Sequence, residues 1–467
     1  MKITTKIISL ALLLIMIFSL LTSCQTIKYG LLSLHKDEKR TPKIIDYIND
    51  AVDGANSYTL TSTGEISTSI MGVDLVIKTE INETMENRLG DAPTKKGVVK
   101  HNYEYSDSSL NFTIERYEGY QDGMLYYGVI NKGKETKLKS ETGVENFKQY
   151  DLEMSTLSLV CGFPTENASS EKADDGSWVI TIKDLSPDYF KSMTNDISVA
   201  VPGYSIDSID ATIKVNSDFT EWESELNYNF SALEGYVFSE GFYVPVATYT
   251  TKISNIDSTT VEKIDLEEYK EAADITIING LVTDIARMLD KEYGKIIVSA
   301  KYVVNYRGST YNASETDTIE YGVVDDKFYY NIAARVDTEI YHIEYADGVR
   351  TTDGVELKTS DTAEKTYLMS LVTGNAYNVL LVKDVRVDAT KPDTYFIDLH
   401  LTDELLETLV IDGRKMTQGT ITMTVSYVND EISVIKVYLK ASASGIAGGA
   451  TYEISITTMV IEYGEQT

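Results

Sequence analysis

Stretches in which every second residue is apolar recur along this chain and constrain its fold more than any other feature. Residues 209–215 and 421–427 are clear examples. Period-two alternation gives a strand one apolar and one polar face, as in an antiparallel sheet that is covered on one side. The chain also contains 33 tyrosines, a residue type that favours strands. We therefore expect a sheet-rich fold, with further strands near residues 222–230, 243–253, 432–439 and 452–461.

The order of these patterns indicates that one unit is written twice. Each copy is predicted to open with an amphipathic helix, built on Ile44, Ile48, Ala51, Val52 and Ala55 in the first copy and on Ile278, Leu281, Val282, Ile285, Met288 and Leu289 in the second. Thr41 and Pro42 have the residue types of an N-cap and a first helical position. A hairpin entered by two tyrosines is expected at residues 120–127 and again at 323–330.

A short helix is expected after a strand in each copy, from Pro187 to Met193 and from Asp403 to Val410. Ser186 and Thr402 are suitable N-caps for these helices. An apolar sheet that curves must fill its concave face with a helix or a ligand, since a large empty cavity is costly. The candidate ligand-binding residues are the apolar side chains expected to point inward from the two helices: Tyr189, Phe190, Leu405, Leu406 and Leu409.

These patterns predict an α+β fold with two tandem copies of a curved antiparallel sheet, a half-barrel, wrapped around helices. The copies are expected at residues 42–257 and 265–467. Between them lies a charged stretch without alternation, from Ser258 to Glu268. Only Cys24 and Cys161 are cysteines. If Cys24 is modified, no intrachain disulfide can form, and stability must come from the core.

The first 23 residues have the layout of an export signal. Lys2 and Lys6 precede an uncharged apolar run over residues 7–21, which is too short to span a bilayer comfortably. Leu21-Thr22-Ser23-Cys24 then resembles a bacterial lipobox. The resemblance implies cleavage before Cys24 and a diacylglycerol on its sulfur, followed by a polar tether over residues 24–41. The alternative is an ordinary secretory signal with a chance cysteine.

The lipobox, the opening helix and a curved sheet with an inserted helix together resemble the LolA/LolB and LppX/LprG group of lipoprotein-carrier-like domains. In that group a half-open barrel encloses a cavity for acyl chains. The strand entry Asp-x-x-[Leu/Phe]-Tyr-Tyr, at Asp122 and again at Asp325, adds to the resemblance. No functional residue of the group transfers to a position in this chain. The sequence resembles uncharacterised tandem-domain lipoproteins of Gram-positive bacteria at least as well.

Charge and the scarcity of catalytic residue types narrow the function. The net charge of −30 argues against nucleic-acid binding. The four histidines form no pair at metal-ligand spacing, and no Gly-x-Ser-x-Gly elbow or phosphate-binding glycine loop occurs. Acidic turns such as Asp174-Asp175-Gly176 lack the spacing of calcium loops. We therefore expect no catalytic site, no metal site and no cofactor.

The sequence favours a lipid-anchored binding protein on the extracytoplasmic face of a cell membrane, holding a lipid or another apolar small molecule in a sheet-and-helix cavity. The membrane is its expected partner through the lipid on Cys24, and the sequence leaves the identity of a protein partner open. The alternative is a non-enzymatic structural or interaction lipoprotein of the cell envelope, with its sheets as an adhesion or assembly surface.

Overall fold

The computed structural model describes residues 32, 36–70, 73–154, 156–190, 197, 201, 204–232, 244–324, 327–336, 339–359, 361–373, 379–401, 406, 409–411, 414–443 and 449–464. The predicted signal peptide and Cys24 lie outside these residues. In the part of the chain described here, no helix is both long enough and apolar enough to span a membrane.

The first large sheet has twelve strands in the order β12-β6-β5-β4-β3-β2-β1-β11-β10-β9-β8-β7. All neighbours are antiparallel except β12, which pairs in parallel with β6. The strands are β1 (Tyr58–Ile70), β2 (Val73–Glu86), β3 (Thr94–Tyr105), β4 (Phe112–Gln121), β5 (Met124–Asn131), β6 (Lys134–Glu141), β7 (Ala168–Lys172), β8 (Trp178–Leu185), β9 (Tyr204–Val215), β10 (Trp222–Ala232), β11 (Val246–Ser254) and β12 (Lys270–Glu271).

The second large sheet has eleven strands in the order β18-β17-β16-β15-β14-β13-β25-β24-β23-β20-β19, and a two-stranded sheet pairs β21 with β22. The strands are β13 (Tyr293–Tyr306), β14 (Ser309–Val324), β15 (Lys327–Val336), β16 (Glu339–Ala346), β17 (Val349–Thr352), β18 (Val355–Lys358), β19 (Val382–Asp388), β20 (Lys391–Leu399), β21 (Val410–Ile411), β22 (Arg414–Lys415), β23 (Gln418–Val428), β24 (Glu431–Ala443) and β25 (Ala450–Gly464).

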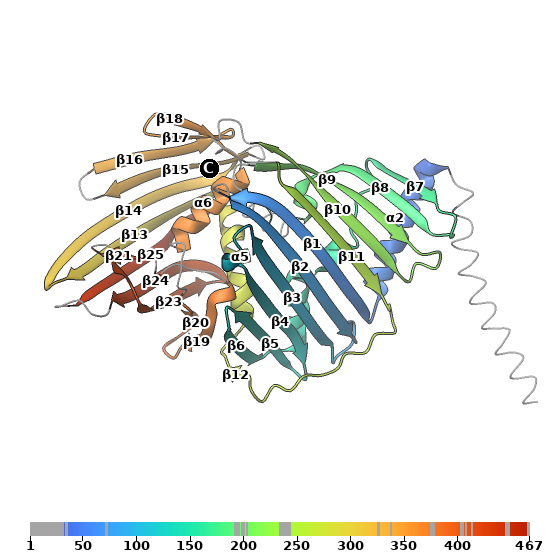
Figure 1. The fold of residues 1–467 in the computed structure, drawn as a ribbon, viewed down its shortest axis with the longest axis horizontal. Coiled ribbons are helices and arrows are strands. Elements are labelled where there is room, and N and C mark those ends of the chain that lie inside the picture. The colour runs from blue at the N-terminus through green and yellow to red at the C-terminus, as the bar shows by residue number, and fades with distance from the viewer. Residues whose placement is uncertain are drawn as a thin grey trace, which may run out of the picture.

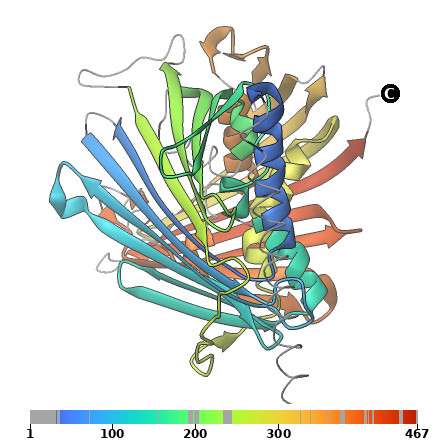
Figure 2. The same ribbon diagram turned by 90° about the vertical axis from the view of Figure 1, so that its right-hand side faces the viewer.

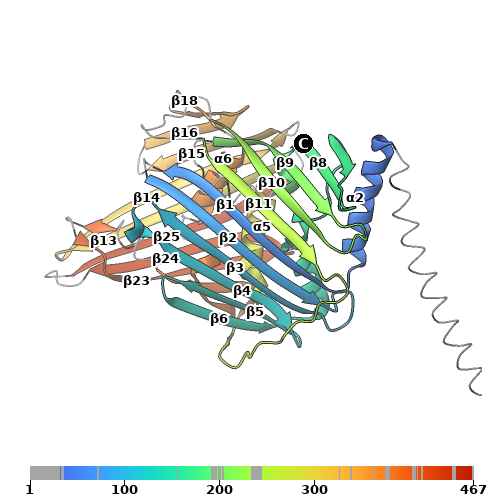
Figure 3. The same cartoon turned by 45° about the vertical axis from the view of Figure 1, so that its right-hand side comes forward.

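The two sheets have the same strand order once β1 is set against β13. In each, the first strand pairs with the last, β1 with β11 and β13 with β25, and only β12 lacks a counterpart. The strands of the two sheets run in different directions (Figure 3). The bounds predicted for the two copies, 42–257 and 265–467, stay predictions, because strand order alone does not fix them.

Within the described residues, four α-helices accompany the sheets: α2 (Asp37–Gly54), α3 (Val144–Met154), α5 (Thr276–Leu289) and α6 (Asp361–Thr373). Helix α2 contacts β7 at the end of the first sheet, away from the second sheet (Figure 1), and it therefore faces the viewer in Figure 2. Helices α5 and α6 contact each other and β24, and they lie between the two sheets (Figure 1).

The predicted α+β class with half-barrels wrapped around helices is wrong, because the structure is mostly β: of the residues that it describes, 60% are in strands and 18% in helices. A sheet of eleven or twelve strands has an apolar face far larger than one or two short helices can cover. One continuous core of buried side chains includes residues from both halves, with Trp178, Trp222, Tyr321 and Tyr330 among its largest members.

The alternating strands were predicted correctly, since Ile209, Ala211, Ile213, Val215, Ile421, Met423 and Val425 are all buried. The matching of the two hairpins was wrong. Residues 120–127 form the β4–β5 hairpin, whereas residues 323–324 end β14 and residues 327–330 begin β15, and these two strands correspond in strand order to β2 and β3. Similar tyrosine pairs on non-equivalent strands misled the sequence comparison.

The predictions for the two opening helices need correction. Helix α2 begins at Asp37, within the predicted tether, so Thr41 is not its N-cap and Pro42 lies inside the helix. The Thr41 hydroxyl instead donates to Asp37 Oδ1 at 3.0 Å. Val282 of α5 is 40% exposed and therefore does not belong to the buried face that was assigned to it.

The expected short helices are also not the main ones inserted between strands. The first is a 3-10 helix, Pro187–Phe190, and most of the second lies outside the described residues. Helices α3 and α6, which precede β7 and β19, were not predicted. Both have acidic residues in the first turn, a helix-start signal that was available in the sequence.

Candidate ligand cleft at the junction of the two halves

The two halves meet around β6, the strand that pairs with the short β12. The backbone N–H of Ala272 donates to Lys139 O at 2.8 Å, and that of Ala273 donates to Val385 O at 3.0 Å. The segment after β12 thus bonds to β6 of the first sheet and β19 of the second. These backbone bonds fix where the following helix, α5, begins.

Side chains of β5 and β6 add further hydrogen bonds between the two halves. The Tyr127 hydroxyl donates to Val379 O at 2.6 Å, and Thr136 Oγ1 lies 2.9 Å from His400 Nε2. Tyr127 is 1% exposed, and its hydrogen bond is partly buried. The junction is therefore packed and hydrogen-bonded, a condition for a rigid binding site.

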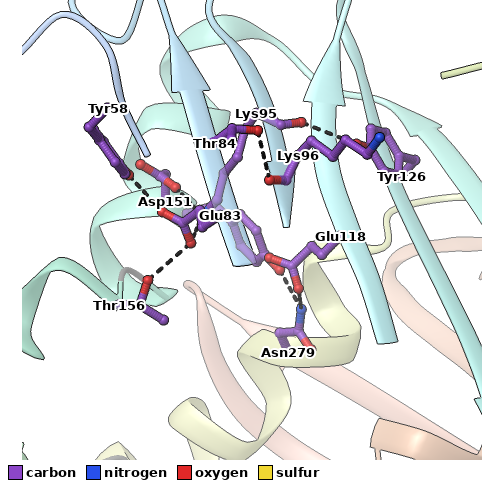
Figure 4. Close-up of polar contacts among 11 residues, drawn as sticks. Tyr58, Glu83, Thr84, Lys95, Lys96, Glu118, Tyr126, Asp151, Thr156 and Asn279 are labelled. Atoms are coloured by element: carbon purple, nitrogen blue, oxygen red, sulfur yellow. Dashed lines mark hydrogen bonds and ion pairs between the residues drawn. The ribbon is translucent and has the colours of Figure 1, made fainter. Parts of the chain in front are cut away.

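A buried ionic network fixes α3 to the first sheet (Figure 4). Lys95 Nζ lies 2.6 Å from Asp151 Oδ1 of α3 and 3.3 Å from Glu83 Oε2 of β2. Glu83 also accepts hydrogen bonds from the hydroxyls of Tyr58 at 2.7 Å and Thr156 at 3.1 Å. Every charged group of the network therefore has an oppositely charged or hydrogen-bonding partner.

Burial and the neighbouring charges shift the pKa values in this network. Burial by itself lowers the pKa of the Lys95 ammonium, but Glu83 and Asp151 outweigh it, and the net pKa lies above the usual value. Burial, together with the nearby charges of Glu83 and Glu118, raises the pKa of the Asp151 carboxyl, although Lys95 lowers it. Lys95 thus stays charged, and the network acts as a structural clamp under α3.

Asn279 links this polar region to α5. Its Nδ2 donates to Glu118 Oε2 of β4 at 3.0 Å and also to the hydroxyl of Tyr150 of α3 (Figure 4 labels Asn279 and Glu118). Asn279 is only 5% exposed. A residue of the second half thus holds a helix and a strand of the first half in place at the junction.

Beside this contact lies a cleft of about 460 Å³. Its walls come from the end of β6, α3, the segment before α5, α5 itself, β20, and the end of β23 with the turn that follows it. Ligand sites are usually concave, occur preferentially between domains, and have volumes of roughly 300–1,000 Å³. In size and position the cleft is suited to a small molecule.

Two tyrosines form the aromatic part of the cleft. The rings of Tyr395 and Tyr427 meet edge to face, with centroids 6.1 Å apart. The Tyr427 hydroxyl donates to Asp284 Oδ2 at 3.1 Å, which fixes its ring. Burial raises the pKa of both phenols, as do nearby carboxylates, Asp284 for Tyr427 and Asp274 for Tyr395. Both side chains therefore remain neutral aromatic surfaces.

The charges on the wall are mostly negative. Five carboxylates line the cleft, those of Glu141, Asp274, Asp284, Asp393 and Asp430, against the single guanidinium of Arg287. Arg287 Nη1 lies 3.1 Å from Asp284 Oδ1. Asp274 accepts hydrogen bonds from the backbone N–H and the hydroxyl of Thr276 and so caps α5.

Gly280 leaves space in this wall. It lies inside α5, where glycine is less favourable than other residues. A Cβ at this position would meet only Asp284 Oδ2, at 3.9 Å, so packing does not require a glycine. The absence of a side chain leaves the cleft open.

The predicted ligand-binding residues do not come together. Tyr189 is 48% exposed, while Phe190 is buried with its ring 6.1 Å from that of Phe163. Leu406 is 7% exposed and lines a different cavity, and Leu409 packs partly buried against the core. Leu405 lies outside the described residues. Each short helix was expected to point its side chains into the cavity of its own copy, and a ligand-binding role for these residues stays a prediction.

The cavity that Leu406 lines has a volume of about 510 Å³. Its apolar wall consists of Leu399, Leu401, Leu406 and Ile421, and the rest of the lining is largely polar. One of the predicted residues thus contributes to a cavity, although not to the junction cleft.

Comparisons with known proteins add no family. No family model matches the chain, and no curated protein matches it. Among solved structures, OccK2 (OpdF) of Pseudomonas aeruginosa aligns over 88% of this chain and 98% of its own at 8% identity and a TM-score of 0.12. OprB of Pseudomonas putida aligns over 88% and 94% at 6% identity and a TM-score of 0.12. Likenesses this weak support no conclusion about fold or function.

Proposed function

We propose that this chain is a lipid-anchored, non-enzymatic binding protein of the extracytoplasmic membrane face, and that its ligand occupies the junction cleft. The observation that carries the proposal is the cleft itself, because both halves build it and Gly280 of α5 leaves it open. Binding proteins commonly place ligands where two units meet. The lipid anchor rests on the sequence around Cys24.

The anchor is tested by Cys24→Ala in cells fed a palmitate analogue that can be tagged. We expect loss of labelling together with an uncleaved or released protein. The other cysteine, Cys161, is partly buried, and burial raises its pKa to about 11, which leaves it a poor nucleophile. Labelling that persists in the variant contradicts the anchor.

The cleft is tested by Gly280→Leu, which fills it from within α5. The exchange should stabilise the helix by about 0.5 to 1 kcal/mol, so lost binding cannot be attributed to unfolding. Gly54→Leu is the matched control, since Gly54 ends α2 and nothing lies within 4 Å of its added Cβ. The test measures the melting temperature of the detergent-solubilised full chain with amines, sugars, carboxylic acids or lipids added. A ligand of the cleft should raise the melting temperature of wild type and of Gly54→Leu but not that of Gly280→Leu. A ligand that still raises the melting temperature of Gly280→Leu binds outside the cleft. If no added compound changes the melting temperature of wild type, the alternative of an envelope scaffold is favoured.

The second candidate function is binding of a lipophilic ligand, favoured by the apolar wall of the cavity that Leu406 lines. Native mass spectrometry after mild purification tests it. A lipid that co-purifies with Gly280→Leu as well as with wild type would support this cavity. Wild-type protein without lipid would contradict it.

A further inference from the structure

We propose that the junction cleft selects a small organic cation, an amine or quaternary ammonium compound. This inference rests on the proposed binding function and adds the chemical class of the ligand. It depends on three features of the described wall: the excess of carboxylates, the paired tyrosines and the open space beside Gly280.

The negative charge of the cleft is not neutralised by its own wall. The guanidinium of Arg287 pairs with Asp284, and Asp274 caps α5, which offsets the positive end of that helix. Among the described residues, no ion pair engages the carboxylates of Asp393 or Asp430. The net charge of −30 adds to the local potential and attracts cations from a distance.

The tyrosines supply the aromatic part of a cation site. A cation over an aromatic face is attracted by the ring quadrupole, and quaternary ammonium groups are recognised in this way. Tyr395 and Asp393 are two residues apart on β20, so alternation places them on the same face of the strand. A positively charged group in the cleft would meet a ring and a carboxylate together.

The shape of the site favours an organic cation over a metal ion. The described residues contain no group of three or more His, Cys, Asp or Glu side chains placed to hold a metal. The carboxylates are instead spread over the walls of a cleft of about 460 Å³. Such an arrangement surrounds a molecule of several atoms.

The test is isothermal titration of the detergent-solubilised full chain with tetramethylammonium, choline, spermidine and the alcohol in which carbon replaces the choline nitrogen. We expect choline to bind at least about tenfold more tightly than this uncharged isostere and to weaken as salt is added. Tyr395→Leu and Asp393→Asn should each abolish the preference for the charged ligand. The controls are Tyr438→Leu and Asp218→Asn, two exposed side chains outside the cleft, which should keep it.

The outcomes separate this inference from the proposed function. If the uncharged isostere binds as tightly as choline and Gly280→Leu abolishes both, the cation class is wrong and the binding function stands. If choline binding survives Gly280→Leu or the Tyr395→Leu and Asp393→Asn variants, the cation lies outside the cleft and the inference fails. If none of the three cations binds, the inference also fails. If no class of solute changes the melting temperature of the wild-type chain, the proposed binding function itself is wrong.

Discussion

At the scale of single residues, Lys95 is notable because its charged side chain and those of both its partners are buried. Its side chain is 5% exposed, and those of its partners Glu83 and Asp151 are 5% and 8% exposed. A buried ion pair adds little net stability over apolar residues, but removing one partner leaves an uncompensated charge. Replacing Lys95 should therefore strongly lower the folding stability of the first half.

We expect Lys95→Met to destabilise the chain by about 3 to 5 kcal/mol, because both carboxylates would stay buried without a cation. Urea unfolding followed by tyrosine and tryptophan fluorescence measures the loss. Lys78→Met is the control, since the Lys78–Glu104 pair on β2 and β3 is 45% exposed at both ends, and it should melt nearly as wild type does. Equal stability of the two variants would contradict the clamp role of Lys95.

Asp317 on β14 gives a pH-dependent prediction. Burial, helped by Glu315, raises the pKa of this carboxyl to about 6, and its Oδ1 has no hydrogen-bond partner among the described residues. Because the folded pKa lies above the unfolded one, the contribution of this group to stability is present in acid and is lost as the pH rises through about 6. Asp317→Asn should then be more stable than wild type by about 1 to 2 kcal/mol at neutral pH and similar to it in acid. Melting curves across this pH range would contradict the assignment if the two proteins stayed parallel.

At the scale of elements, polar contacts attach the inserted helices to their sheets. Asp151 of α3 bonds to Lys95, while Asp361 and Glu364 of α6 accept hydrogen bonds from the hydroxyls of Tyr345 and Tyr330. Each half thus has a carboxylate-bearing helix fixed to buried polar groups of the sheet. Hydrophobic periodicity alone misses such helices, since α3 and α6 are only weakly amphipathic.

The segment between β20 and β22 provides the prediction at this scale. Leu406 is buried, so Leu406→Glu would place an unpaired carboxylate against the core and cost about 2 to 4 kcal/mol. Val428→Glu is the control, because Val428 is 60% exposed on β23, and it should be nearly silent. The neighbour of Leu406 in the chain, Glu407, lies outside the described residues and is therefore not used as the control. Thermal melts that coincide for the two variants would show that Leu406 does not pack inward.

At the scale of the whole molecule, the connection between the halves is bound to the first sheet along its length. Gln121 both donates to and accepts from the backbone of Ile264, at 2.8 and 3.0 Å, and Lys263 pairs with Asp122 at 2.5 Å. Lys139 adds a bond to Leu266 O. The connection has little regular structure, yet its backbone is fixed, and the cleft depends on this placement of α5.

Limited trypsin digestion tests this arrangement. The native chain should resist cleavage after Lys263, and Gln121→Ala should speed it by releasing both bonds to Ile264. Gln418→Ala removes only an exposed contact to Ser442 and serves as the control. Equal cleavage rates in the two variants would mean that the connection is held by other contacts.

Local sequence pattern was enough to predict the alternating strands and the presence of the two opening helices, although not where α2 begins. Period-two alternation identified inward residues such as Ile213 and Met423, because a strand with one buried face must alternate. Local pattern could not decide how the sheets are covered, and it assigned that task to helices around Tyr189 and Leu406. Tertiary structure decided that the halves share a core and that Asp393, Tyr395 and Tyr427 meet α3 and α5 in one cleft. These contacts join residues more than a hundred positions apart, and no local periodicity encodes such distances.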